Sequence, residues 1–200
     1  MRLFVALTPP QGVLQALRAA TAPLQELAPA LRWTRPEQWH VTLVFLGEVD
    51  EGTTAELARR LERAAARHPP LSLALGGGGR FGQRVLWTGI HGDREGLRRL
   101  ADSVQAAARR SRLPVQQRPY QPHLTLVRAS DPETDLRPLV ERLGRWQCPP
   151  WVATQLELVR SRLGAGPDRS AVHEPIGSWP LLGQPSVGST RDNGPAGCAE

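Results

Sequence analysis

The sequence predicts an α+β fold in which two similar lobes, each an antiparallel sheet flanked by helices, surround a central cleft. The chain has 200 residues, a length that suits one compact unit. Strand-like and helix-like segments alternate without a strict βαβ rhythm, which favours antiparallel sheets. A phrase also occurs twice: RPEQWHVTLV at residues 35–44 and RPYQPHLTLV at residues 118–127 share Arg, Pro, Gln, His, Thr, Leu and Val at the same places. This repetition predicts a pseudo-twofold duplication.

The first segments predict a strand followed by a helix. Residues 3–7 are uniformly apolar, as expected of a buried strand, and residues 10–27 carry apolar side chains at helical spacing, with a break expected near Pro23. Residues 40–46 combine β-branched and aromatic side chains and predict a second strand, which ends at Gly47.

A second helix is expected over residues 53–67, after a polar turn that begins at Asp50. Its buried stripe would be Leu57, Leu61, Ala64 and Ala65. Two prolines end this helix, and residues 71–75 and 84–90 then predict a hairpin whose loop is the glycine run at residues 76–79.

Aspartates mark the next two helix starts. Asp93 can cap a helix that runs to residue 110, with apolar side chains on one face and arginines on the other. Asp131 followed by Pro132 predicts the start of a helix that ends near residue 143. The order of elements is therefore similar around the two copies of the phrase.

The last third of the chain predicts a long strand over residues 152–161 and a weaker one over residues 171–176. From Gly183 the sequence is rich in Gly, Pro, Ser, Asn and Thr, with little to bury, which predicts disorder. We therefore expect one bilobal domain over residues 1–182 and a polar, disordered tail over residues 183–200.

The charge balance favours an anionic partner. Lys and Arg together number 25 against 19 Asp and Glu, giving a net charge of +6, and every one of the 25 is arginine. The planar guanidinium group binds two phosphate oxygens at once, so an arginine surface suits nucleic acid. A GC-rich genome would produce the same composition, so charge alone does not decide between the two explanations.

Cysteine content and the N-terminus indicate the compartment. Cys148 and Cys198 are too few and too late in the chain for a disulfide framework or a tetrahedral metal site. The apolar start MRLFVAL is shorter than a signal-peptide core and far short of a membrane span. We expect a monomeric, cytoplasmic protein that has no membrane partner.

The repeated phrase places chemistry on one face of each strand. Residues two apart in a strand point to the same side, so His40 lies with Thr42 and His123 lies with Thr125. If the lobes face each other, these groups converge on one cleft. Two imidazoles on opposite sides of a small anion suit phosphoryl transfer, because in-line displacement needs a base at the attacking oxygen and an acid at the departing one. With a pKa of about 6.5, one ring can be neutral and the other charged at working pH.

Other chemistries fit the sequence less well. Neither phrase groups enough Cys, Asp or Glu residues with its histidine to complete a metal site, so no metal and no cofactor is expected. The GxSxG elbow of serine hydrolases is absent from the sequence. The glycine run at residues 76–79 lacks the GK[ST] ending of a phosphate-binding loop.

The repeated motifs resemble a known family. HVTL at residues 40–43 and HLTL at residues 123–126 resemble the paired HxTx signatures of the two-histidine (2H) phosphoesterases. The surrounding sequence is similar to the LigT-like RNA 2',3'-cyclic phosphodiesterases of bacteria and archaea. The resemblance covers most of the chain and includes MRLFVAL, RPEQWHVTLVFLGEV, RVLW, RPYQPHLTLVR and LELVRSRLG.

The resemblance implies metal-independent hydrolysis of a 2',3'-cyclic phosphate at an RNA end to a 2'-phosphomonoester, with a weak reverse reaction that joins RNA ends through a 2',5' linkage. It implies His40 as the proton donor to the departing 3' oxygen, His123 as the base that activates water, and Thr42 and Thr125 as phosphate-binding residues. Relatives often carry an aromatic residue, commonly Tyr, near the position of His173.

Three arginines are candidate RNA contacts: Arg128, directly after the second motif, and Arg35 and Arg118, which begin the two phrases. A surface or turn role is the alternative for each. Phe81, Trp87 and Trp39 are candidates for stacking on a base, with core packing as their alternative. Two other functions stay open: a phosphodiesterase acting on a small cyclic nucleotide, and a non-catalytic binder of RNA ends.

Overall fold

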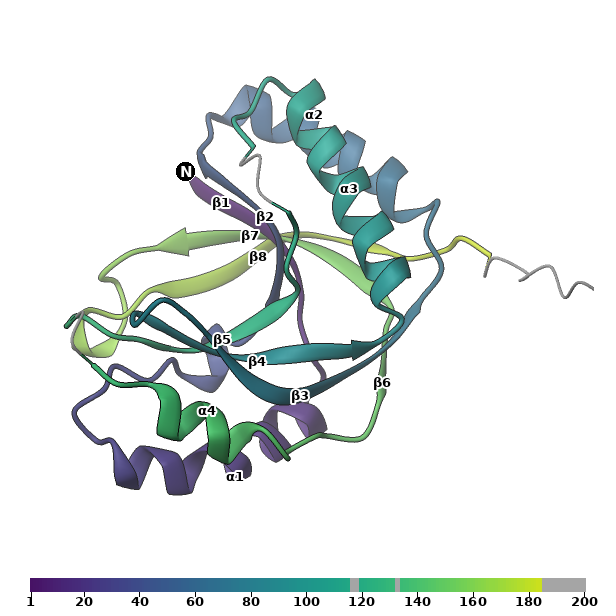
Figure 1. Ribbon diagram of the computed structural model, residues 1–200. Coiled ribbons are helices and arrows are strands. Elements are labelled where there is room, and N and C mark those ends of the chain that lie inside the picture. Colours follow the sequence, from purple (N-terminus) through teal and green to yellow (C-terminus); the bar gives the residue numbers. More distant parts are fainter. Residues whose placement is uncertain (116–118, 132–133, 185–200) are drawn as a thin grey trace, which may run out of the picture.

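The computed structural model describes residues 1–115, 119–131 and 134–184 of the chain (Figure 1). The described residues form four α-helices: α1 (Gln11–Leu27), α2 (Glu51–Ala65), α3 (Arg94–Arg110) and α4 (Arg137–Leu143). They also form eight strands: β1 (Arg2–Leu7), β2 (Val41–Glu48), β3 (Leu71–Phe81), β4 (Val85–Gly92), β5 (His123–Arg128), β6 (Trp151–Ala153), β7 (Gln155–Arg162) and β8 (Val172–Pro180).

The strands make two four-stranded sheets, in the orders β2-β1-β7-β8 and β5-β4-β3-β6. Neighbouring strands are antiparallel throughout the described residues. The predicted α+β class with two similar lobes is therefore confirmed. One contiguous cluster of buried apolar side chains draws on both sheets and all four helices, so the lobes share a core.

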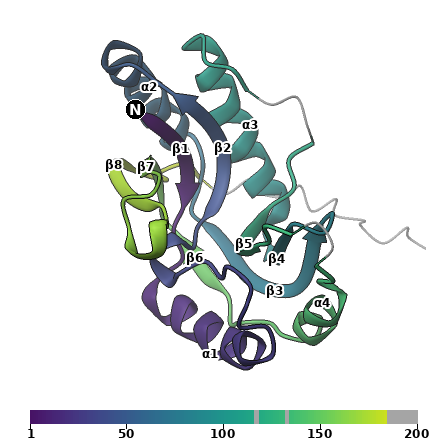
Figure 2. The ribbon, with the colours of Figure 1, turned by 90° about the vertical axis from the view of Figure 1, so that its left-hand side faces the viewer.

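The duplication predicted from the repeated phrase is visible in the order of elements. The run β1–α1–β2–α2 recurs as β4–α3–β5–α4, and β1 pairs with β2 as β4 pairs with β5. The strands that carry the repeated motifs, β2 and β5, are edge strands of their sheets and contact each other. Helices α2 and α3 lie side by side at one end of the molecule, and α1 and α4 lie at the opposite end (Figures 1 and 2).

The position of β1 in the centre of its sheet explains why apolar and polar residues do not alternate along it. Leu3, Val5 and Leu7 point into the main core, while Phe4 and Ala6 point to the other face and form a small cluster with Val159. Both faces are covered, so every position favours an apolar residue. The second face, which carries Phe4, becomes part of the site described below.

The helix caps at Asp50 and Asp93 and the buried stripe of α2 agree with the predictions from the sequence. Asp50 accepts a hydrogen bond from the Thr53 amide at 2.8 Å, and Asp93 accepts one from the Gly96 amide at 2.7 Å. All four side chains of the stripe predicted for α2 are buried.

The break expected in α1 is wrong: the helix continues through Pro23. Pro23 is exposed while Thr21 and Leu24 are buried, so water can satisfy the carbonyl that proline leaves free and packing holds the helix on both sides.

The glycine run does not form the predicted loop. Strand β3 continues through it, and the turn lies at Gly82, where φ is 56°. The reason is close packing: a Cβ at Gly78 would lie 2.7 Å from Cβ of Leu143 in α4, and one at Gly79 would collide with the ring of Trp87. Glycine here lets a helix and an indole approach the strand.

Two other predicted boundaries are wrong. Helix α4 begins at Arg137 rather than after Asp131, and Pro132 lies outside the described residues. The single strand predicted over residues 152–161 is two strands: β6 pairs with β3 in one sheet and β7 pairs with β1 in the other. The chain changes sheets at Thr154, whose carbonyl accepts a hydrogen bond from the Leu181 amide at 2.8 Å. Period-two patterning is the same on both sides of such a crossing, so the sequence does not reveal it.

The tail predicted to be disordered falls mostly outside the described residues, which end at residue 184. Gly183 still donates its amide proton to the carbonyl of His68 at 2.9 Å. No helix within the described ranges combines the length and the apolar character needed to cross a membrane.

Candidate active site

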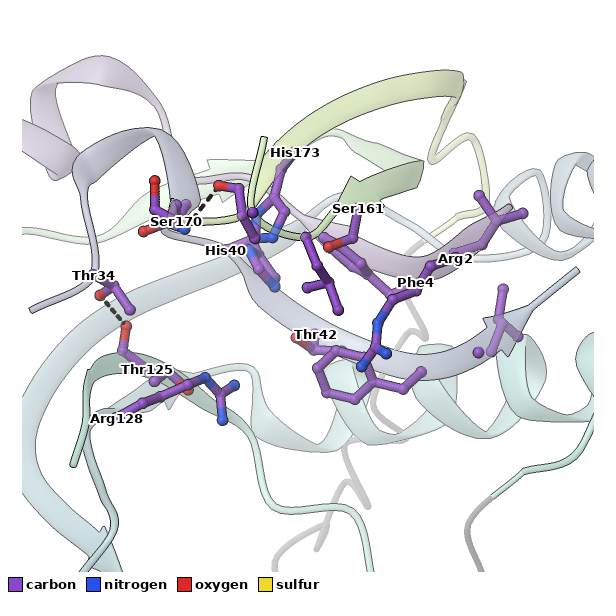
Figure 3. Close-up of a pocket in the computed structure, with 18 of the residues that line it drawn as sticks. Arg2, Phe4, Thr34, His40, Thr42, Thr125, Arg128, Ser161, Ser170 and His173 are labelled. Atoms are coloured by element: carbon purple, nitrogen blue, oxygen red, sulfur yellow. Dashed lines mark hydrogen bonds between the residues drawn. The ribbon is translucent and has the colours of Figure 1, made fainter. Parts of the chain in front are cut away.

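A cavity of about 930 Å³ opens between the two lobes (Figure 3). Strands from both sheets line it, and the two repeated motifs meet there: His40 and Thr42 from the first lobe and His123 and Thr125 from the second. Apolar residues of the same motifs point the other way, since Val41, Leu43, Leu124 and Leu126 are all buried in the core. The alternation predicted for both motifs is therefore confirmed.

His123 is the first residue of β5 and is held by the backbone of Gln121 and by two aromatic rings. Its Nδ1 lies 2.8 Å from the carbonyl oxygen of Gln121. A carbonyl can only accept, so Nδ1 carries a proton and Nε2 of the neutral ring is an acceptor. The Phe81 ring meets the imidazole edge-on at 4.8 Å, and Trp87 lies at 6.1 Å. Burial lowers the pKa of His123.

His40 directly precedes β2 and is packed more tightly. The ring of Phe4 stacks on it at 4.4 Å and 24°, and the ring of His173 meets it edge-on at 5.1 Å and 73°. Burial lowers the pKa of His40 to about 3, helped by the positive charges that His173, Arg128 and His123 would carry and opposed by a hydrogen bond to the backbone of Gln38.

The two imidazoles thus sit in similar settings. Each bonds to the backbone of a residue two positions earlier, Gln38 or Gln121, and each has two aromatic rings against it. Both pKa values are lowered, so both rings are neutral at pH 7 in the free protein. The prediction that one ring is neutral and the other charged at working pH therefore applies to the complex with an anionic substrate, not to the free protein. The physical cause of the lowered pKa values is burial in a site whose described lining residues include other potential cations and no carboxylate.

A short segment before the first motif ties the two lobes together. Residues 32–34 run along the edge of β5, where Trp33 pairs with Val127. The Thr34 hydroxyl donates to the carbonyl of Thr125 at 2.9 Å (Figure 3) and to that of Leu126 at 3.0 Å. It also accepts a hydrogen bond from the indole of buried Trp39 at 2.9 Å. The first motif is therefore anchored directly on the strand that carries the second.

Gln38 anchors the first phrase to the residue that precedes β8. The Gln38 amide donates to the carbonyl of Ala171 at 2.9 Å, two residues before His173. Its side-chain oxygen accepts the Arg35 amide proton at 2.9 Å, which closes a short 3-10 turn at Pro36–Gln38. These contacts give the shared Gln of the phrase a structural role in the first lobe.

The three candidate arginines have different positions. Arg128 ends β5 and lines the cavity; burial lowers its pKa, and the nearby charge of Arg2 lowers it further. Arg35 is not among the residues that line the cavity, and its backbone belongs to the 3-10 turn. Arg118 lies outside the described residues.

Several side chains in and near the site were not predicted. Phe4 and His173 contact His40, and no local signal marks them, because they reach it only through the pairing of β1, β7 and β8. The resemblance led us to expect an aromatic residue near this position, and the imidazole of His173 meets His40 edge-on there.

The remaining candidates differ in their positions. Trp39 is a core residue, as its alternative predicts, whereas Phe81 and Trp87 are half-buried and pack against His123 rather than in the core. The other two histidines lie outside the cavity lining: His68 bonds to the Ser103 hydroxyl and His91 to the Gly76 carbonyl. Within the described ranges, no three His, Cys, Asp or Glu side chains cluster in a way that could hold a metal ion.

Two duplicated lobes that bring a pair of HxT motifs to one cavity define a 2H phosphoesterase. The chain belongs to the 2'-5' RNA ligase superfamily, whose sequence profile matches residues 6–165. It is 30% identical to an RNA 2',3'-cyclic phosphodiesterase of Geobacillus stearothermophilus over 186 residues, which cover 91% of this chain and 58% of the relative. The chain therefore spans little more than half of that relative's length.

Other relatives match over nearly their whole length. The RNA 2',3'-cyclic phosphodiesterase of Escherichia coli is 29% identical, with 90% of this chain and 96% of the relative covered. The crystal structure of TT0787 of Thermus thermophilus superposes with a TM-score of 0.75 at 27% identity and covers 92% of this chain and 100% of that one. The predicted resemblance to LigT-like 2H phosphoesterases is confirmed.

Proposed function

We propose that this protein hydrolyses the 2',3'-cyclic phosphate at RNA ends to a 2'-phosphomonoester. The observation that carries the proposal is the meeting of two His and Thr pairs, one from each lobe, in a single cavity. The names of the relatives support the same reaction.

His123 is the proposed base. Its Nδ1 proton is engaged by the Gln121 carbonyl, so the lone pair on Nε2 is available to take a proton from water. The water oxygen attacks phosphorus as this proton leaves. A pKa below the usual value keeps the ring unprotonated at pH 7, as a base requires.

His40 is the proposed acid, an assignment supported by the family resemblance. It gives a proton to the 3' oxygen as the bond between phosphorus and that oxygen breaks, leaving a 3'-hydroxyl and a 2'-phosphate. Thr42 and Thr125 are the proposed donors to the non-bridging oxygens, and Arg128 lies on the same cavity wall as Thr125.

The low pKa of His40 is compatible with this role once substrate binds. A monoanionic phosphodiester about 4 Å from the ring would favour the imidazolium by about 4 kcal/mol at an effective dielectric constant near 20. That corresponds to about three pKa units. Substrate binding would therefore raise the pKa of His40 from about 3 in the free protein toward neutral pH.

Turnover gives the direct test. We expect a fluorescent oligoribonucleotide with a 2',3'-cyclic phosphate end to be converted to the 2'-phosphate in the presence of EDTA, with the product identified by ³¹P NMR. Tight binding without conversion would instead indicate a non-catalytic binder of RNA ends. Supplying a 5'-hydroxyl RNA in place of water as the nucleophile tests for a 2',5' linkage.

The pH dependence follows from the two pKa shifts. In the free protein, the His40 resonance in ¹H NMR should not titrate between pH 5 and 8, because the pKa is about 3. Saturating inorganic phosphate should raise that pKa, while His68, which lies outside the cavity lining, should be unaffected.

The rate of hydrolysis in the substrate complex should rise with pH as His123 loses a proton and fall as His40 loses one. Titration of His40 near the usual histidine pKa in the free protein, or a rate that does not change from pH 5 to 9, would contradict the proposed roles of the two histidines.

A further inference from the structure

A second, smaller cavity lies outside the proposed active site. It has a volume of about 330 Å³ and lies between the start of α2 and the end of α3, at the top of Figure 1, and we call it the α2–α3 pocket. None of the residues that line it also lines the active-site cavity. Its lining is rich in arginine: Arg60 belongs to α2, Arg110 ends α3, and Arg112 follows two residues later.

The α2–α3 pocket has a surplus of positive charge. Glu56, the acidic residue of its described lining, is already paired: its carboxylate lies 2.6 Å from Arg60 and also contacts Arg59. Neither Arg110 nor Arg112 forms a salt bridge with another residue in the described ranges. Two guanidinium groups are therefore left without a counter-ion in a concave site, which favours an anionic ligand.

Two buried donors on the same lining have no acceptor among the described residues. Ser111 is 8% exposed, and its hydroxyl has no hydrogen-bond partner. The Nε–H of Arg60 is also buried without a partner, although the end of that side chain pairs with Glu56. Buried donors are almost always satisfied in native proteins, so two orphan donors in one basic pocket indicate that an acceptor binds there. A tetrahedral oxyanion presents several acceptor oxygens at once.

The backbone at Arg112 is strained. Its φ is 59°, in the left-handed region. The Leu113 amide donates to the carbonyl of Ala108 at 3.1 Å and the Arg112 amide donates to that of Arg109 at 3.0 Å, a helix ending in which glycine is the usual residue at this position. Arginine is sterically disfavoured there, yet its side chain lines the pocket. Strain of this kind is concentrated at ligand-binding sites.

The same two segments of the chain border the α2–α3 pocket and the active-site cavity. Gly47 of β2 lines the cavity, and Gly52, five residues later, lines the pocket. Pro114 lines the cavity, and Arg112, two residues earlier, lines the pocket. Two residues span at most about 7 Å. An RNA strand that leaves the cavity between these segments therefore reaches the pocket next.

We propose that the α2–α3 pocket is a second phosphate-binding site, which holds an internal phosphodiester of the RNA strand whose cyclic-phosphate end lies in the active-site cavity. Its donors are Arg60, Arg110, Ser111 and Arg112. The inference rests on the proposed function. It assigns the protein to oligonucleotides, because a nucleoside 2',3'-cyclic phosphate is too short to occupy both sites.

The salt dependence of binding tests the second site. For a decaribonucleotide that ends in a 2'-phosphate, the double variant Arg110→Gln/Arg112→Gln should reduce the slope of log Kd against log salt by about 0.7, the value for one phosphate contact on a single strand. Arg63→Gln/Arg109→Gln is the matched control, because it removes two exposed charges from α2 and α3 outside both linings and should leave the slope unchanged. Equal slopes for the wild type and the first variant, or an equal loss in the control, would overturn the proposal.

Turnover separates this site from the proposed reaction. Arg110→Gln/Arg112→Gln should lower kcat/KM for a decaribonucleotide with a 2',3'-cyclic phosphate end by about 2- to 5-fold, the size expected for exposed ion pairs. It should leave kcat/KM for a nucleoside 2',3'-cyclic phosphate unchanged. If the wild type hydrolyses neither substrate, the proposed function fails, while the salt slopes still test the pocket. If it hydrolyses both and the variant affects both equally or neither, the pocket proposal alone fails.

Arg112→Gly distinguishes binding from a structural role. Glycine adopts a positive φ without strain, so the midpoint of urea unfolding should not fall, while affinity for the decaribonucleotide should fall. Affinity that is lost only together with stability would overturn the proposal. Inorganic phosphate tests the other source of the same anion: if it shifts the Ser111 amide resonance in NMR while all variants bind the decaribonucleotide equally, the pocket is a site for free phosphate and the assignment to RNA is wrong.

Discussion

Replacing His123 with alanine is expected to lower kcat for a cyclic-phosphate oligonucleotide by at least about 10²-fold, the usual contribution of a positioned general base. The ring lines the cavity, and its Nδ1 bond to Gln121 leaves Nε2 as the only free acceptor of the neutral imidazole. His40→Ala should have an effect of similar size, because the departing 3' oxygen then has no proton donor. Single-turnover rates, with the protein in excess over the oligonucleotide, would measure both.

The double variant sharpens this test. If the two rings act in one step, removing both should cost little more than removing one, since neither can complete proton transfer alone. His68→Gln is the matched control, because His68 bonds to Ser103 and lies outside the cavity lining. Full activity in His40→Ala, or an equal loss in His68→Gln, would rule out the proposed mechanism.

Thr34→Val is expected to destabilise the protein and to lower activity together. The substitution keeps the side-chain shape but removes a hydroxyl that donates to Thr125 and Leu126 and accepts from Trp39. The Trp39 indole is buried, so its N–H would have no partner, which costs about 1–3 kcal/mol. Urea unfolding would measure the free-energy change. The activity loss follows because the first motif is anchored on β5 through this residue.

Thr34→Ser provides the control, since it retains the hydroxyl and loses only a methyl group. Its free energy of unfolding and its kcat should lie closer to wild type than those of Thr34→Val. Equal free energies of unfolding for Thr34→Val and wild type would show that the segment of residues 32–34 does not hold the lobes together through this side chain.

The parts of the fold that were predicted correctly are those set by local pattern. The stripe of α2 and the caps at Asp50 and Asp93 depend on residues within one or two helical turns. The errors occur where distant packing decides. Glycines 76–79 read locally as a loop, but α4 packs against them and they remain in β3. The segment around Thr154 reads as one strand, but its two halves pair in different sheets.

By itself the sequence determined that His40 would share a face with Thr42, and His123 with Thr125, because a strand has a side-chain period of two wherever it lies. The duplication of the phrase also determined that two such faces exist. Only the tertiary structure decided what surrounds them. Phe4 and His173 reach His40 through the register of three strands that are distant in sequence, and the resulting burial moves a pKa that would otherwise lie near 6.5 to about 3. Desolvation and charge proximity depend on distances in space, and a period along the chain contains no such information.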